Sequence, residues 1–300
     1  MQRDPVAQAD SQMIGSCLSR GRNGYNREAD IFGSSMIDIG WITFVLKLLL
    51  VPTFIAVVSL AGRRWGTTVS GWLIGLPFTS APVAFFLALE QGNFFAYKAS
   101  EGIMLGIVSV FVFCLVYGRS ALRLSWFGST LLGMVAFFAC TFLLDMVALP
   151  LFVEFALAVF VLVAVALLMP HVGSDSLSGW RTRWELPARM VSATALVIVI
   201  TGAAPFLGPQ LTGLLSPFPI YATTLAVFTH RSQGGGEAVK LLRGVVVGSF
   251  TFIIFFLILS LTIMTWGVGF SFLLAIGVSL LTHFVSLQVL RFRDRIPGLR

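Results

Sequence analysis

The stretch that decides the fold is Gly71-Trp-Leu-Ile-Gly-Leu-Pro77, because a related stretch, Gly213-Leu-Leu-Ser-Pro-Phe-Pro219, follows 142 residues later. Outward from this motif, residues 66–118 align on residues 208–260 at a constant offset and without a gap. Thirteen aligned positions are identical, whereas composition alone would give roughly four in so apolar a window. We therefore interpret the chain as an internal duplication.

The identical residues include many that are costly to keep in a lipid-facing helix, namely glycine, proline and lysine. The identical pairs are Gly66/Gly208, Gly71/Gly213, Leu73/Leu215, Pro77/Pro219, Ala84/Ala226, Phe86/Phe228, Gln91/Gln233, Gly92/Gly234, Ala96/Ala238, Lys98/Lys240, Gly102/Gly244, Gly106/Gly248 and Leu115/Leu257. A duplicated membrane domain is typical of transporters.

Composition places the chain in a membrane. Hydrophobic residues make up 57% of the sequence and charged residues 11%, with a mean hydropathy of +0.93, whereas globular proteins contain about 25% charged residues. The net charge of +7 does not indicate nucleic acid, because the Lys and Arg residues lie mostly in short loops between apolar segments. The three cysteines show no metal-binding spacing, and we interpret them as buried structural thiols.

Nine segments are apolar for about the 20 residues that a bilayer crossing requires. These segments are 39–61, 69–90, 96–118, 124–145, 148–170, 187–207, 210–229, 238–262 and 267–290. The least obvious boundary lies between Asp145 and Pro150. The 46-residue stretch from Ser125 to Pro170 that contains it is too long for one helix and about right for two.

The loops predict the orientation. Almost all basic residues fall on one side of a nine-span topology, which identifies that side as cytoplasmic. They are Arg63, Arg64, Arg119, Arg123, Arg181, Arg183, Arg231, Lys240, Arg291, Arg293 and Arg295. The opposite loops contain Lys98 and little else that is basic. We therefore expect a multi-pass protein of the bacterial inner membrane with a periplasmic N-terminus and a cytoplasmic C-terminus.

The predicted fold is all-α, with about nine transmembrane helices in two inverted four-helix repeats joined by an extra helix. Repeat 1 covers residues 39–147 and repeat 2 covers residues 187–290. Between them, residues 148–186 form the extra span and a cytoplasmic loop, and the odd number of crossings inverts the second repeat. Residues 291–300 are a cytoplasmic tail. Residues 1–38 are polar and lack apolar periodicity, so we expect disorder there and consider Met36 an alternative start.

The repeated prolines are the first candidate for a binding site. Pro77 and Pro219 each free a backbone carbonyl near mid-span, which is tolerated where protein or a water-filled cavity satisfies it. If both helices are broken, their C-terminal halves direct positive dipole ends inward, as suits a polar or anionic ligand. The candidate substrate-binding residues are Pro77, Thr79, Ser80, Ser216, Pro219, Tyr221, Thr223 and Thr224. Two ordinary proline kinks are the alternative.

Ionisable residues within spans are the second candidate, since they are costly there. Lys47 and Arg189 are equivalent at the same offset and are candidates for coupling or gating, with snorkelling to the interface as the alternative. His283 is either a hydrogen-bonded core histidine or a proton-coupling group. His230, at the inner end of span seven, either meets substrate or marks the membrane edge. We assign no role to Glu154.

Several chemistries have no motif in this sequence. A nucleotide-binding GxxxxGK[ST] loop, a zinc-binding HExxH pair, a Cys/His metal cluster and a GxSxG nucleophile elbow are all missing. We therefore expect no enzyme activity, no catalytic residues, no metal and no cofactor.

The run from Gly213 to Ala226, followed by His230-Arg231 and by Leu242-Arg-Gly244, resembles the GlpM family of small bacterial inner-membrane proteins. Those proteins have about four spans, so each resembles one half of this chain. The resemblance covers about 75 residues per half and rests on a short Gly/Phe-Pro/Arg-Gly pattern. It implies a loose link to glycerol metabolism and envelope polysaccharide. The chain departs from the family in carrying two copies and an extra span.

Two functions fit these observations. The first is a secondary transporter that moves a small polar or anionic solute by alternating access. The repeats and the paired prolines favour this function. The second is a non-transporting accessory or regulatory protein of envelope or glycerol metabolism. The expected partners are the lipid bilayer and the solute, with a second copy of the chain as a candidate, and no nucleic acid.

Overall fold

The computed structural model describes residues 42–53, 56, 77, 79–170, 172 and 185–293. The chain divides into two compact units, Met1–Leu46 and Lys47–Arg300. The first unit is described only from residue 42, where the helix Ile42–Thr53 begins. The predicted tail 1–38 with Met36, the motif residues 71–76 and the basic residues Arg181 and Arg183 lie outside the described residues.

All regular secondary structure in the described part of the chain is helical. The helices of the second unit are α3 (Ser80–Gln91), α4 (Asn93–Ser120), α5 (Trp126–Asp145), α6 (Leu151–Leu168), α7 (Glu185–Leu215), α8 (Ile220–Gln233), α9 (Gly235–Gly248) and α10 (Phe250–Arg293). Five segments are long and apolar enough to cross a membrane: Asn93–Ser120, Trp126–Asp145, Leu151–Leu168, Met190–Leu215 and Gly235–Thr282. The chain thus has the architecture of an α-helical membrane protein.

Helix α4 is the centre of this unit. It packs against α3, α5, α6, α7, α9 and α10, and most of its length is buried. Gly102 and Gly106 allow α7 to approach closely, since a β-carbon on Gly102 would lie 2.6 Å from the Gln210 carbonyl oxygen. Membrane helices associate largely through such van der Waals packing, because lipid tails remove the hydrophobic drive for helix–helix contact. Small residues therefore place α4 at the core.

Helices α5 and α6 form an apolar outer surface. Large side chains on them are widely exposed, including Phe127, Phe142, Phe152, Phe160 and Leu167, each more than 60% accessible. So many exposed phenylalanines and leucines would be a liability in water, whereas a bilayer solvates them. Helix α5 ends at Asp145 and α6 begins at Leu151, so the chain breaks where the length argument placed the boundary.

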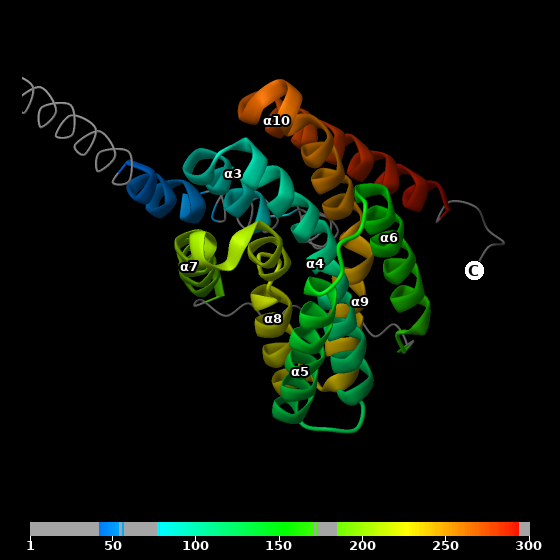
Figure 1. Cartoon of the computed structure of the whole chain (residues 1–300). Coiled ribbons are helices and arrows are strands. Elements are labelled where there is room, and N and C mark those ends of the chain that lie inside the picture. The colour runs from blue at the N-terminus through cyan, green and yellow to red at the C-terminus, as the bar shows by residue number, and fades with distance from the viewer. Residues whose placement is uncertain are drawn as a thin grey trace, which may run out of the picture. The chain divides into compact units, whose positions relative to one another are not determined.

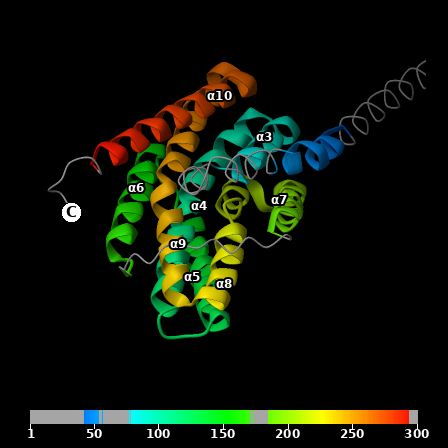
Figure 2. The same cartoon turned by 180° about the vertical axis from the view of Figure 1, so that it is seen from behind.

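Helix α4 runs antiparallel to α9 and the first part of α10. In Figures 1 and 2, α4 descends from its junction with α3 to the loop before α5, while α9 starts near that loop and leads up into α10. A β-carbon on Gly235, at the start of α9, would meet the carbonyl oxygen of Ala121, just beyond the end of α4. We call this end of the helices, around residues 117–125, the lower end, and the end around residues 90–101 the upper end.

The helices break at positions that the 142-residue offset makes equivalent. Gly92 separates α3 from α4 with φ 86° and ψ 169°, and Gly234 separates α8 from α9 with φ 96° and ψ 168°. This left-handed conformation favours glycine because a side chain is strained there. A second pair follows, since Ser125 precedes α5 and the equivalent Gly267 interrupts α10. The two copies thus share breaks at these two pairs of positions.

Two predicted spans are divided at the repeated prolines, and a third, 238–262, is interrupted at Ser249. Residues 210–229 are divided by a non-helical stretch at residues 216–219, with α7 before it and α8 after it. In the span 69–90, Pro77 is not helical and α3 begins only at Ser80. Proline explains both breaks because it removes the backbone donor that a continuous helix requires.

Candidate functional site

The break between α7 and α8 lies at mid-height of the central helix. Pro217 and Leu214 face Gly106, near the middle of α4, where a β-carbon would lie 2.9 Å from the Pro217 ring. On the other side, the ring of Phe218 packs edge-on against Phe137 of α5, with centroids 5.4 Å apart. Non-helical backbone therefore occurs deep between helices, which a membrane protein tolerates only inside protein or along a cavity.

Both helices that follow these breaks start without a side-chain cap. The residue before α8 is Pro219, and the residue before α3 is Thr79, whose hydroxyl makes no capping hydrogen bond. The first backbone N–H groups of a helix lack partners within the helix and carry partial positive charge. Local backbone satisfies part of each N-terminus, since the Ile220 N–H donates to the Phe218 carbonyl and the Ala81 N–H donates to the Pro77 carbonyl.

Three of the candidate hydroxyl groups are buried without a hydrogen-bond partner among the described residues. They are Ser80 Oγ, Ser216 Oγ and Thr223 Oγ1, and the residues Ser80 and Ser216 are fully buried. Most buried polar groups in proteins are hydrogen-bonded, because an unsatisfied hydroxyl costs free energy. These groups are therefore suitable for binding a polar ligand or water.

The structure brings only some of the candidate residues together. Ser216 and Thr223 flank Pro219 at the α7–α8 break, together with the half-buried Thr224. Ser80, Thr79 and Pro77 belong to the α3 break, and the main neighbours of α3 are α4, α7 and α10, not α8. Two separate polar breaks against a common central helix are what the described residues show.

Lys47 is a buried ion-pair residue. It is 6% exposed, its Nζ lies 2.5 Å from Glu90 Oε1, and it donates a hydrogen bond of 2.7 Å to Thr201 Oγ1. The ammonium also lies 5.4 Å from the centre of the Phe86 ring. Breaking such a buried pair on one side is strongly destabilising. Lys47 thus joins the first helix to α3 and α7.

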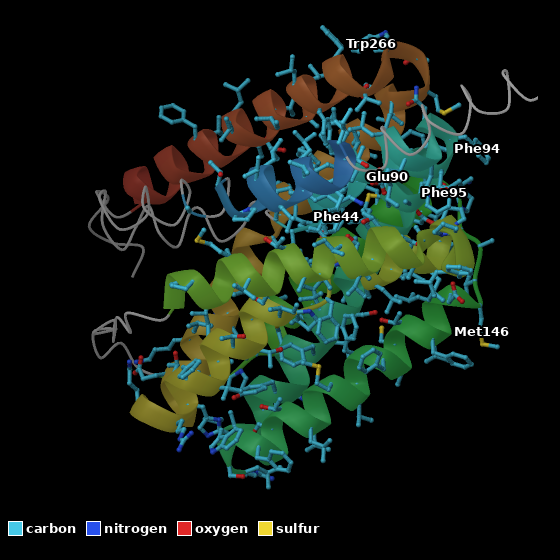
Figure 3. The ribbon with its side chains drawn as sticks, turned by 90° about the vertical axis from the view of Figure 1, so that its left-hand side faces the viewer. Phe44, Glu90, Phe94, Phe95, Met146 and Trp266 are labelled. Atoms are coloured by element: carbon cyan, nitrogen blue, oxygen red, sulfur yellow. The ribbon has the colours of Figure 1, made fainter. Side chains whose placement is uncertain are left out.

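Glu90 was not predicted as part of any site. It ends α3 only two residues before the break at Gly92, so the sequence alone suggests a residue at the membrane edge. Figure 3 shows its side chain among those of the helices, whereas Phe94 and Met146 project outward. No sequence period relates Glu90 to a lysine 43 residues earlier, and only the packing of helices pairs them.

A second polar cluster missed by the sequence analysis lies at the upper end of α4. Lys98 Nζ lies 2.8 Å from Glu101 Oε2, and the Tyr97 side chain hydrogen-bonds to the same glutamate. Glu154 of α6 interacts electrostatically with both Glu101 and Lys98. Glutamates within apolar segments were the available signal, but a pairing between different helices leaves no trace in local sequence.

His230 lies at the opposite, lower end, next to the Gly234 break and away from the proline breaks. Its Nδ1 is 3.4 Å from the hydroxyl of Tyr117, and its ring packs edge-on against that tyrosine. Burial lowers the pKa of His230 below its usual value, which favours the neutral imidazole. The neighbouring Arg231 lies over the ring of Trp126 at 5.8 Å. His230 therefore contacts the end of the neighbouring helix α4. A role in meeting substrate, one of the two alternatives from the sequence, stays a prediction.

The remaining candidates belong to helices, but their side chains are outside what the structure describes. Arg189 lies in α7, Tyr221 in α8 and His283 in α10. Among the described residues, no group of three or more His, Cys, Asp or Glu residues is arranged to hold a metal ion. Their roles stay predictions.

These features define an all-helical membrane protein with polar helix breaks deep in its interior. No family model, curated protein or solved structure matches the chain. Its function is therefore inferred from its own residues.

Proposed function

We propose that this chain is a secondary transporter of a small polar or anionic solute. The solute binds at the two proline breaks, before α3 and between α7 and α8. The observation that carries the proposal is the α7–α8 break at mid-height of α4. Non-helical backbone, a helix N-terminus without a side-chain cap and the Ser216 hydroxyl, which has no hydrogen-bond partner among the described residues, occur there together. Discontinuous helices whose N-termini face a central site bind anionic substrate groups in many transporters.

Two inverted repeats would give this protein its two alternating conformations. The antiparallel course of α4 relative to α9 and α10, and the equivalent breaks at Gly92 and Gly234, support that architecture. In an inverted pair, exchanging the conformations of the two repeats converts an outward-open state into an inward-open one. Such a pair of repeats would be the physical basis for alternating access.

The charges at the two ends support an inner-membrane orientation with the lower end in the cytoplasm. The lower end carries the exposed residues Arg119, Arg123 and Arg231, while the upper end carries four acidic residues. The acidic residues are Glu90, Glu101, Asp145 and Glu154. Cytoplasmic loops are enriched in Lys and Arg. We therefore assign the upper end to the periplasm.

Solute exchange in proteoliposomes tests the site. A panel of inorganic phosphate, small carboxylates, phosphorylated sugars and polyols is screened for stimulated exchange, and Ser216→Ala and Ser80→Ala are then compared with wild type. We expect each variant to weaken apparent affinity about fivefold, since one hydrogen bond contributes about 1 kcal/mol. Ser129→Ala, which removes an equally buried and unpartnered hydroxyl on α5, is the matched control. Absence of exchange across the whole panel, or equal loss in the control, contradicts the proposal.

Cysteine labelling tests the inverted topology independently of any solute. Gln91→Cys and its equivalent Gln233→Cys, each introduced after replacement of Cys17, Cys114 and Cys140, flank the two glycine breaks. We expect an impermeant maleimide to label position 91 only from the periplasm and position 233 only from the cytoplasm. Labelling of both from one face would show parallel repeats and remove the argument for alternating access.

A further inference from the structure

The upper end of α4 and α6 carries two buried carboxylates and a single lysine. Glu101 and Glu154 are each 6% exposed, and Lys98, whose side chain is 44% exposed, pairs with Glu101 at 2.8 Å. Glu101 also accepts a hydrogen bond from the Tyr97 side chain. Lys98 therefore balances the charge of Glu101, whereas no ion pair among the described residues balances the charge of Glu154.

Glu154 has the poorer surroundings. Its Oε2 is buried and has no hydrogen-bond partner among the described residues. Helix α6 packs against α4, α9 and α10, and the described groups that act electrostatically on Glu154 are Glu101 and Lys98, with Tyr97 close by. Burial and the nearby Glu101 both disfavour a second negative charge, whereas Lys98 favours it. The site is thus poised between a charged and a neutral carboxyl.

A proton suits this site better than a metal cation. Hard cations such as Ca²⁺ require six to eight oxygen ligands, and an ammonium next to the carboxylates repels any cation. Proton-driven transporters use buried Asp and Glu residues as proton carriers. The two carboxylates also come from different helices, so a relative movement of α4 and α6 changes the balance of charges around Glu154.

We propose that Glu154 binds and releases the proton that couples solute movement to the proton gradient. The inference rests on the proposed transport function and names its coupling ion. A proton from periplasmic water forms the O–H bond at Oε2, giving a neutral carboxyl, and that bond breaks when the proton is returned to water in the alternate conformation. Lys98 pairs with Glu101 at 2.8 Å, and this pair supplies the charges on α4 that act on Glu154.

Infrared spectroscopy of the purified wild-type protein tests proton binding without any solute. A protonated carboxyl has a C=O stretching band that a carboxylate lacks and that shifts in D₂O. We expect a band whose intensity changes with pH in wild type, which is lost in Glu154→Gln and persists in Glu237→Gln. Glu237 is the matched control because it pairs with Lys240 on α9, the equivalent of Lys98. Persistence of the same band in Glu154→Gln overturns the proposal.

Lys98→Gln provides a second test that does not require Glu154 to be replaced. Lys98 is partly exposed, so its loss leaves no cavity, and removing its positive charge makes ionisation of Glu154 harder. We expect the midpoint of the band to rise by about one pH unit or more. An unchanged midpoint contradicts the proposed interaction and overturns the assignment of Glu154.

Solute flux separates this inference from the proposed function. In proteoliposomes, wild type should show uptake that an inward proton gradient accelerates, whereas Glu154→Gln should retain solute exchange and lose the acceleration by the gradient. Exchange with no effect of the gradient in wild type overturns proton coupling while leaving transport intact. No flux of any solute, with the Glu154 band present, overturns the transport function and leaves Glu154 as a proton-binding site.

Discussion

Helix α4 and its counterpart in the second copy, α9 with the first part of α10, share an origin in sequence but not their surroundings. Six helices surround α4, which is continuous over 28 residues. The counterpart is interrupted at Ser249 and exposes Val247 and Leu261. Equivalent sequences thus form the centre of the fold in one copy and part of its periphery in the other.

The shared glycines show what this difference means. On α4, Gly102 faces Gly213 of α7 so closely that a β-carbon on Gly213 would overlap the Ala99 carbonyl oxygen. The equivalent Gly244 is exposed, and a β-carbon there would meet no described residue within 4 Å. A glycine identical in sequence is a packing site only where another helix approaches it.

The equivalent lysines Lys98 and Lys240 also differ in their charged surroundings. Lys98 pairs with Glu101, three residues after it, whereas Lys240 pairs with Glu237, three residues before it. The position equivalent to Glu101 is Arg243. Each lysine keeps a carboxylate within one helical turn, but among the described residues it is the Glu101 carboxylate of the first copy that interacts with a second buried glutamate, Glu154.

The largest effect that separates the two copies is expected from glycine substitution. Gly102→Ala would place a methyl group 2.6 Å from the Gln210 carbonyl oxygen and 3.1 Å from the Gly213 Cα, so α7 and α4 must move apart. We expect a loss of about 3 kcal/mol in the free energy of unfolding. Gly244→Ala should instead be neutral or stabilising by roughly 0.5–1 kcal/mol, because alanine is the better helix former. Thermal unfolding in detergent measures both.

That comparison has a clear contrary result. Equal destabilisation by the two substitutions would show that Gly244 is as tightly packed as its α7-facing counterpart. The difference between the centre and the periphery would then be wrong.

A smaller difference in the free energy of unfolding is expected between substitutions of Lys47 and of its equivalent Arg189. Lys47→Met leaves the Glu90 carboxylate without its partner in a buried position, and we expect a cost of about 3 kcal/mol or less, since Glu90 is partly accessible. Arg189→Met should cost less, because Ser232 stands where the first copy has Glu90. Denaturant unfolding measures the two costs, and Lys47→Met with Glu90→Met should recover part of the loss. A larger cost for Arg189→Met would contradict the comparison.

The smallest effect concerns the feature in which the copies agree. Gly92→Ala and Gly234→Ala each force alanine into the left-handed region, at φ 86° and 96°, where an added β-carbon meets no described residue within 4 Å. We expect similar costs of about 1 kcal/mol, set by the backbone alone. The shift in unfolding midpoint measures them. A cost confined to one copy would show that the two breaks are not equivalent.

The sequence by itself determined the properties that arise from local or additive physics. Hydropathy accumulates along each segment, so the membrane class, the helices and the division between Asp145 and Leu151 were predictable. Glycine and proline act through their own backbones, so a break at Pro219 was visible as a motif. The repeat offset further predicted that Gly92 and Gly234 are equivalent, and their backbone angles agree.

Only the tertiary structure decided which of these residues meet. Lys47 was expected at either the interface or a gate, and the packing of α3 and α7 placed it in a buried ion pair with Glu90. From the sequence, Glu154 had no assigned role. Its interaction with Glu101 exists because α6 packs against α4. Such pairs join residues tens of positions apart, and no local period encodes them. Their energies depend on burial and distance, which exist only after the helices have packed.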